Sequence, residues 1–350
     1  MFRRSGREGN YAYTVARVKA KKSLLLGEED YNKMLLMSVP EISRYISESS
    51  YQKEMAEYAG KVSGIDLVER ATYASMAKVF SSILMASQGE LRNLVSAYLN
   101  KWDIWNLKVI LRGKSFGLDA ESIRDDLVPA GSLSADDLDK LIALDSHEDI
   151  ITAFGKMEGV NVQEAIDLYK NEGNLGAVED YLDKYHYASL LGSVMPTSRP
   201  AKMFQDFVRK EIDIKNVKVI LKLKAEGVYG EPVMKYYIPG GMQVDVKYAT
   251  QLANSETIAE AANDLSHLEF YDVIKDAIEA DKVSLRDVVT LMKRYELAQA
   301  NKLSHMYPLS MIPVVDYMIH KEIEVKNIRT IARGIESGLD REIIKGLLVI

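Results

Sequence analysis

One helical segment occurs three times in this 350-residue chain, and that repetition constrains the fold more than any other feature. The copies align without gaps at spacings of 110 and 111 residues: DIWNLKVILRGKSFGL from Asp103 to Leu118, DIKNVKVILKLKAEGV from Asp213 to Val228, and EVKNIRTIARGIESGL from Glu324 to Leu339. Solenoid repeats commonly span about 20–50 residues. The longer spacing therefore predicts compact helical subdomains rather than a solenoid.

Each copy has the pattern of a capped amphipathic helix. In the first, Ile104, Leu107, Ile110 and Leu111 follow the three-and-four spacing of one helical face. An acid opens each copy, where it would favour the positive end of a helix, and a glycine closes it, where a left-handed cap is common. The residues shared by all copies are the asparagines Asn106, Asn216 and Asn327, the closing glycines Gly117, Gly227 and Gly338, and the basic pairs Lys108/Arg112, Lys218/Lys222 and Arg329/Arg333.

Turns that follow the copies suggest where the units divide. Leu127–Gly131 and Tyr237–Gly241 both contain a Pro and end in Gly, a combination that terminates a helix. Leu348–Ile350 reaches the point where the third such turn would begin, and an acidic helix start like those after the other turns is found at 25–31. We therefore predict an all-α fold of three similar subdomains, 1–131, 132–241 and 242–350, in a pseudo-threefold arrangement around a central depression.

Composition supports a helical globular protein and excludes several classes of function. Hydrophobic residues make up 47% of the chain, and with 21 Gly and 8 Pro the helix breakers are sparse. The absence of cysteine excludes disulfides, thiol catalysis and cysteine-ligated metals. No apolar run is long enough for a transmembrane helix, and no signal-peptide pattern opens the chain.

Charge is distributed unevenly along the chain. Residues 1–24 carry +6, while the remainder carries −12. The basic arm is compatible with contacts to phosphate or anionic lipid, and equally with a solvated leader followed by the polar face of a first helix. The acidic remainder argues against nucleic acid as a partner.

No motif indicates an active site, cofactor or metal. Gly113-Lys-Ser115 lacks the first Gly of a phosphate-binding loop and ends a helix instead of opening one. Acid clusters such as Asp136-Asp137 and 28–30 fall at expected helix starts, where the helix dipole explains them. The histidines show no metal-ligand spacing; they are His147, His186, His267, His305 and His320.

Two repeated features leave a structural and a functional interpretation open. An Asn inside an amphipathic helix needs hydrogen bonds for its amide, either to neighbouring backbone of its own unit or to a partner. The basic pairs lie one helical turn apart, so they form either a solvated face or three equivalent patches that attract an acidic partner.

These motifs together resemble the C subunit of archaeal-type (A/V-type) ATP synthases, which is related to the d subunit of vacuolar ATPases. The resemblance spans the chain and rests on Tyr11–Ala20, Leu24–Tyr31, the three Asn-containing helices and Ile238–Gly241. It implies a non-catalytic funnel of three helical subdomains, peripheral on the cytoplasmic face of the membrane. Its implied partners are the central shaft subunits and the membrane proteolipid ring, with no cofactor and no small-molecule substrate.

The resemblance implies a rotor role in which ATP chemistry occurs elsewhere and this chain passes rotation between shaft and ring. The alternative is a free-standing helical scaffold that binds a partner in its central depression. A helical enzyme with an unrecognised site is a third interpretation, for which the sequence offers no supporting motif.

Overall fold

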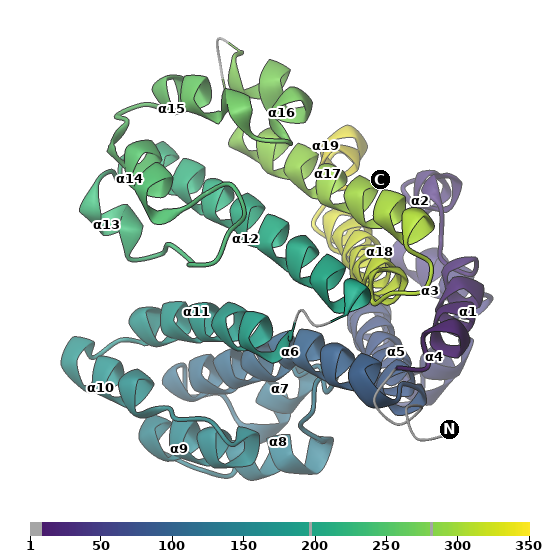
Figure 1. Cartoon of the computed structure of the whole chain (residues 1–350). Coiled ribbons are helices and arrows are strands. Elements are labelled where there is room, and N and C mark those ends of the chain that lie inside the picture. The colour runs from purple at the N-terminus through teal and green to yellow at the C-terminus, as the bar shows by residue number, and fades with distance from the viewer. Residues whose placement is uncertain (1–8, 196–197, 281–282) are drawn as a thin grey trace, which may run out of the picture. The chain divides into compact units, whose positions relative to one another are not determined.

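The computed structural model describes residues 9–195, 198–280 and 283–350. Helices form throughout these ranges and no strand occurs in them, which confirms the predicted all-α class. Figure 1 shows long helices accompanied by short ones. The longest are α5 (Gly64–Ala86), α6 (Gly89–Ser115), α12 (Arg199–Ala225), α17 (Leu285–Met306) and α18 (Ile312–Glu336).

Contacts divide the chain into two compact units. One contains Tyr73–Ser193 and the described residues before α1 (Tyr11–Lys22); the other contains Tyr11–Thr72 and Val194–Ile350. The boundary between Thr72 and Tyr73 falls within α5. The finer division into three units, at 131 and 241, stays a prediction.

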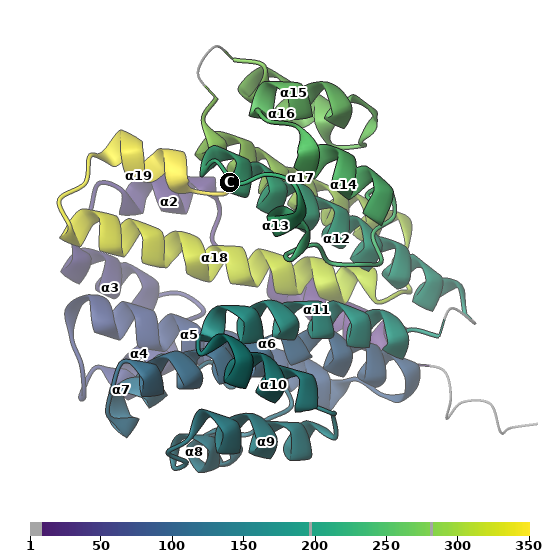
Figure 2. The same cartoon turned by 90° about the vertical axis from the view of Figure 1, so that its left-hand side faces the viewer.

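In the first unit, α6 pairs with α11 (Leu175–Ser193), and four shorter helices lie against this pair. Figures 1 and 2 show that the short helices, which connect α6 to α11 in the chain, lie along one side of this pair. They are α7 (Ala120–Asp125), α8 (Ala135–Ile142), α9 (His147–Glu158) and α10 (Gln163–Glu172). The shared core includes Leu107, Leu141, Phe154 and Val178, all buried.

The second unit contains a comparable set built on α12 and α17. Short helices again connect the two long ones. They are α13 (Glu231–Met234), α14 (Val246–Asn254), α15 (Ile258–Asp264), the 3₁₀ turn η1 (Leu265–His267) and α16 (Tyr271–Ile278). Their core includes Val217, Leu252, Phe270 and Met292.

The two ends of the chain also come together in the second unit. The helix α18 contacts α1, α2 (Glu28–Met34) and α3 (Val39–Ser47) as well as α19 (Arg341–Leu347). In Figure 1 the purple N-terminal helices accordingly lie beside the yellow C-terminal ones. A short helix, α4 (Gln52–Tyr58), packs on α3 and leads into α5.

Local sequence fixes where several helices begin. Hydroxyl side chains of Ser134, Ser146, Thr257 and Ser284 each accept a hydrogen bond from the backbone N–H three residues on, at the starts of α8, α9, α15 and α17. Asp136 and Asp137 lie in the first turn of α8, and residues 28–30 in the first turn of α2, which confirms that these acids mark helix starts.

One local prediction is wrong. Asp103, Asp213 and Glu324 do not open their helices, since α6 begins at Gly89, α12 at Arg199 and α18 at Ile312. All three carboxyls are buried in the middle of a long helix. The dipole at a helix start therefore cannot explain these acids, and their hydrogen bonds have to.

Candidate functional site: the three repeated helices

The repeated asparagines make the same pair of hydrogen bonds in every copy. The side chain of Asn106 donates to the C=O of Val128 and accepts from its N–H, both at 2.8 Å. Asn216 bonds Ile238 in the same way at 2.8 Å, and Asn327 bonds Val349 at 2.8 and 3.1 Å. Each pair, here called an asparagine bridge, joins residues 22 positions apart. All three amides are buried and their hydrogen-bonding groups are used inside the chain.

The buried acids at the start of the first two copies hold the turn that follows the asparagine bridge. Asp103 accepts from the N–H groups of Ser132 and Leu133 at 2.7 and 3.0 Å. Asp213 accepts from three successive N–H groups, those of 242–244, at 2.8–3.0 Å. Burial raises the pKa of Asp103 to about 7 despite these bonds, and burial also raises the pKa of Asp213.

Glycine is required at one position of each of these turns. A Cβ added to Gly131 would overlap the Asp103 carboxyl, and one added to Gly241 would overlap that of Asp213. The Pro-Gly turns predicted to end helices thus have a second role. They let the backbone approach a buried acid closely enough for the N–H groups to bind it.

The third copy receives its turn from the other end of the chain. Glu324 accepts a hydrogen bond from the N–H of Leu26 at 2.9 Å, while Asn327 bonds Val349. The N–H of Leu26 therefore binds Glu324 as the N–H of Leu133 binds Asp103. The segments at 25–31 and 348–350, which resemble the end and the beginning of such a turn in the sequence, thus both bind the third repeated helix.

The closing glycines end the repeated helices in a left-handed conformation. The φ angles are 67° at Gly117, 78° at Gly227 and 69° at Gly338. In each copy the next residue donates its N–H to a carbonyl five positions back, at 2.9 Å. This bond belongs to the Schellman arrangement, in which a non-glycine residue would be strained.

Gly113 has a packing role instead of a phosphate-binding one. It lies inside α6, where a Cβ would overlap Ile123, and Gly334 has the same relation to Ile344. The second copy has Leu223 and Val233 at the corresponding positions, where Val233 is in the core and Leu223 packs against that core.

The basic pairs of the first and third copies form ion pairs within their own units. Lys108 lies 2.7 Å from Asp183, and the Arg112 guanidinium binds the Glu179 carboxylate through two hydrogen bonds. In the third copy, Arg329 and Arg333 both contact Glu69, with 2.8 Å between Arg333 Nη2 and its carboxylate. The predicted patches are thus partly neutralised in these two copies.

The second copy differs from the other two. Lys222 is exposed and Lys218 half-buried, and no ion pair forms at either side chain among the residues that the structure describes. Burial, followed by the nearby charge of Lys293, lowers the pKa of Lys218.

The histidines occupy separate places in the structure. His147 contacts Ser115 and Tyr169, His186 packs edge-on against Tyr187, His267 lies beside Tyr248, and His305 and His320 bond the carbonyls of Asn301 and Asp316. Within the described ranges, no three His, Asp or Glu side chains are grouped so that they could hold a metal ion.

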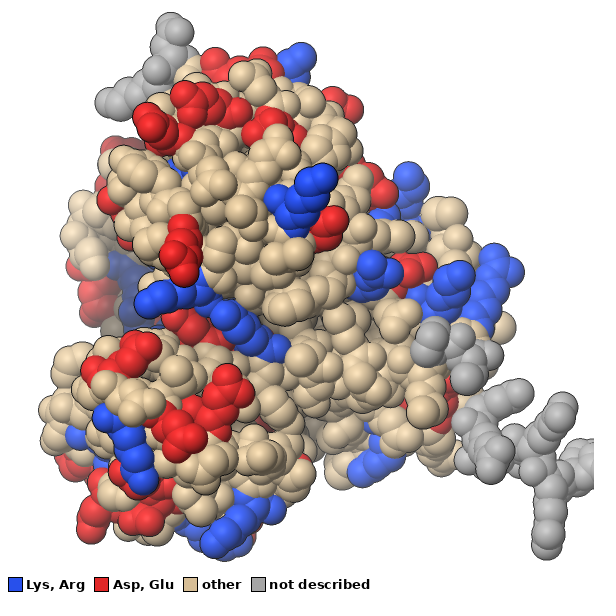
Figure 3. All heavy atoms as spheres, turned by 60° about the vertical axis from the view of Figure 1, so that its left-hand side comes forward, with Lys and Arg blue, Asp and Glu red and all other residues tan. Residues whose placement is uncertain are grey.

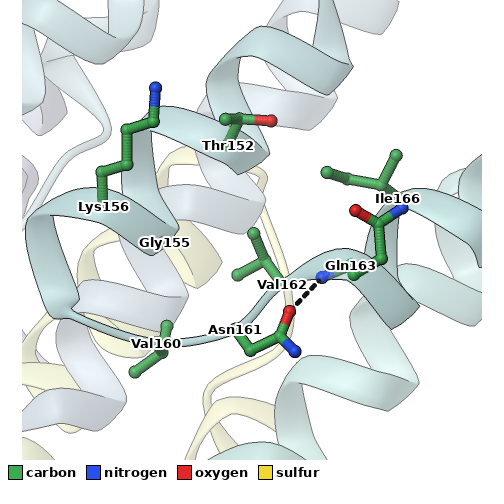
Figure 4. Close-up of a pocket in the computed structure, with 8 residues that line it drawn as sticks. All are labelled: Thr152, Gly155, Lys156, Val160, Asn161, Val162, Gln163 and Ile166. Atoms are coloured by element: carbon green, nitrogen blue, oxygen red, sulfur yellow. Dashed lines mark hydrogen bonds between the residues drawn. The ribbon is translucent and has the colours of Figure 1, made fainter.

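A cavity of about 220 Å³ lies between α9 and α10. Figure 4 shows Thr152 and Lys156 on the first of these helices, Val160 and Val162 on the turn that follows it, and Gln163 and Ile166 on the second helix. The Gln163 N–H donates to the side chain of Asn161 at 2.9 Å, which shapes the turn before α10. No carboxylate or imidazole lines this cavity, so it lacks an acid–base pair.

Sequence reasoning did not predict two ion pairs that involve buried charged side chains of α18. Lys321 lies 2.9 Å from Glu324 and 3.9 Å from the ring centre of Tyr51, with 2% or less of either charged side chain exposed. Five residues before Lys321, Asp316 binds Lys22 at 2.7 Å. Burial opposes ionisation of Asp316, but hydrogen bonds from His320 and Lys22 lower its pKa. The spacing of three residues between Lys321 and Glu324 was the available signal in the sequence.

No helix in the described parts of the chain is long and apolar enough to cross a bilayer. The molecular face in Figure 3 shows Lys and Arg interspersed with Asp and Glu among broad uncharged areas. The arginines at positions 3, 4 and 7 of the predicted basic arm lie outside the described residues. Of the rest of the arm, Arg17 contacts Tyr13 and Lys22 binds Asp316.

Repeated long helices, each fixed to a distant turn by a buried asparagine bridge, define an all-helical protein with an internal repeat. Comparison with known proteins assigns the family. Residues 14–347 match the ATP synthase (C/AC39) subunit family, and the chain belongs to it.

Similar proteins from archaea cover nearly the whole chain. A protein of Methanococcoides burtonii, named as the C subunit of an A-type ATP synthase, is 38% identical, over 99% of this chain and 96% of its own length. Proteins of the same name from Archaeoglobus fulgidus and Haloferax volcanii are 35% and 33% identical, over 99% and 97% of this chain and 98% of their own lengths.

Proposed function

We propose that this chain is a central-stalk rotor subunit of an A-type ATP synthase, acting as a socket that couples the rotary shaft to the membrane proteolipid ring. The observation that carries the proposal is the family match over 14–347, together with near full-length similarity to proteins named as the C subunit of A-type ATP synthases. In this role the chain passes rotation during ion transport and ATP synthesis or hydrolysis. It performs no chemistry itself.

The architecture of the proposed socket is three helical subdomains, 1–131, 132–241 and 242–350, closed into a funnel with pseudo-threefold symmetry. The asparagine bridges support this proposal because each one fixes a long helix to a turn of its own unit. Torque transfer requires such stiffness, since a compliant coupler would absorb rotation as internal deformation. The proposed location is peripheral, on the cytoplasmic face of the cell membrane.

The experiment that tests the proposal is reconstitution of the synthase with and without this chain. Complexes are purified through a tag on one of the catalytic subunits and inserted into vesicles, and ATP hydrolysis and ion pumping are measured together. The expected result without the chain is hydrolysis that continues while pumping is lost, with recovery of pumping when the purified chain is added. Unchanged pumping without the chain would overturn the rotor role, and a chain that never co-purifies with the complex would favour the scaffold.

A further inference from the structure

A cavity of about 170 Å³ lies where α12, α17 and α18 meet in the second compact unit. Three lysines line it, one from each helix: Lys218, Lys293 and Lys326. Glu296 of α17 lines it as well and binds Lys293 at 2.9 Å. Three converging ammonium groups are thus accompanied on the cavity wall by one carboxylate.

Comparison of the repeats shows which residues are missing here. Helices α5, α11 and α17 align at a spacing of 110 through the buried residues Val68, Val178 and Val288, and again one turn later through Thr72, Leu182 and Met292. In this alignment Glu69 and Glu179 correspond to Val289. Asp183 corresponds to Lys293.

The second copy has therefore lost the acids that neutralise the repeated basic residues in the other two. Glu69 binds Arg333 and Arg329, and Asp183 binds Lys108. In the second copy the corresponding positions hold the apolar Val289 and Lys293, whose charge has the same sign as that of Lys218.

The electrostatics of the cavity agree with this loss. Burial and then the charge of Lys293 lower the pKa of both Lys218 and Lys326. Burial opposes the charge of Lys293 too, but Glu296, with Glu211 and Glu322, outweighs it and raises the pKa. Lys293 is thus compensated, and the unfavourable interaction remains with Lys218 and Lys326.

We propose that this cavity binds a carboxylate from an acidic side chain of a partner protein, between Lys218 and Lys326. The carboxylate takes the place beside Lys218 that Asp183 has beside Lys108 and Glu69 has beside Arg329. The chemistry follows from the repeat, where the basic residue equivalent to Lys218 has a carboxylate beside it in both other copies, and from the size of the cavity, whose walls include Ile214 and Val289. A short acidic side chain satisfies both charge and shape.

The direct test uses the purified full chain and a fluorescein-labelled hexaglutamate peptide at low salt, with affinity read from anisotropy. K218M/K326M is expected to weaken binding by about tenfold, since two charged hydrogen-bond donors are lost. The charge-matched control K247M/K275M, at exposed positions of α14 and α16, is expected to leave affinity unchanged. Equal weakening by the control and by K218M/K326M would overturn the proposal.

A second variant closes the cavity without removing a lysine. V289E restores the acid of the other copies, so it is expected to block the peptide to a similar extent while thermal stability is kept or increased. Unchanged peptide binding by folded V289E would contradict the proposed location. Inorganic phosphate at matched ionic strength distinguishes the source of the anion, because a phosphate site would be saturated by phosphate and only weakly occupied by the peptide.

Carbodiimide coupling in the assembled complex identifies the partner group. The reagent joins an amine to a contacting carboxylate with loss of water, so peptide mapping is expected to find Lys218 or Lys326 bonded to an Asp or Glu of another chain. Both lysines remaining freely acetylatable in the complex would overturn the inference. Because the peptide titration needs only the purified chain, it decides the inference independently of the rotor function.

Discussion

Glu324 Oε1 accepts a hydrogen bond from the backbone N–H of Leu26 at 2.9 Å, across a sequence separation of 298 residues. The other carboxylate oxygen, Oε2, binds Lys321 at 2.9 Å. One buried acid therefore joins the early segment of the chain to α18 and also neutralises a buried lysine.

Replacing Glu324 with alanine removes both functions. E324A is expected to lower the free energy of unfolding by about 3–5 kcal/mol, because the buried Lys321 ammonium is left unpaired. Denaturant unfolding measures the change, with the exposed E121A as a control near zero. The double variant E324A/K321M should recover part of the loss, and a double variant as unstable as the sum of its parts would contradict this assignment.

The asparagine bridges are testable in parallel copies. N106A and N216A each leave a buried N–H and C=O without a partner, at Val128 and Ile238 respectively. Each variant should lose about 2–4 kcal/mol of stability. N263A, at an exposed position of α15, is the matched control. A loss no larger than that of N263A would mean that water or a rearranged turn satisfies these backbone groups.

Gly131 offers a test of the close approach between turn and acid. G131A places a methyl group against the Asp103 carboxyl, so the turn must move and its N–H bonds to Asp103 must lengthen. The expected loss is about 2–4 kcal/mol in urea unfolding. G60A, where an added Cβ meets no atom within 4 Å, should be nearly neutral. Similar stabilities for the two variants would show that the turn adapts freely.

Asp103 gives the stability a defined pH dependence. Its pKa is about 7 in the folded chain, against an ordinary value of 3.8. Between these values the folded state keeps a proton that the unfolded state has lost, so stability falls as pH rises toward 7 and changes no further above it. Wild type should lose about 1–3 kcal/mol more than D103N between pH 5 and pH 8. Parallel pH profiles for the two proteins, measured by urea unfolding, would exclude this pKa.

Sequence periodicity predicted much of the fold, and the reasons are local. The repeated helices, their terminal glycines and the acidic starts of α2 and α8 depend on spacing and capping, which neighbouring residues determine. The misplaced helix starts at Asp103 and Asp213 have a tertiary cause. A buried acid that binds a distant turn has the same sequence appearance as an acid at a helix start.

The partners of the basic residues were beyond sequence reasoning for a related reason. Lys108, Arg112 and Arg333 look alike in an alignment of copies, yet their acids lie on another helix about 70 or 260 residues away. Only the packing of α6 on α11, and the contacts of α18 with Glu69 of α5, show that these charges are paired. Lys218 looks equivalent to them in the sequence and differs in its surroundings.

The contact between Leu26 and Glu324 also determines an order of assembly during synthesis. Residues 25–47 leave the ribosome early, but α18, against which α2 and α3 pack, is translated almost 300 residues later. The sets of helices built on α6/α11 and α12/α17 are local in sequence and can form during translation. Part of the apolar surface of the early helices therefore stays uncovered until α18 has been made.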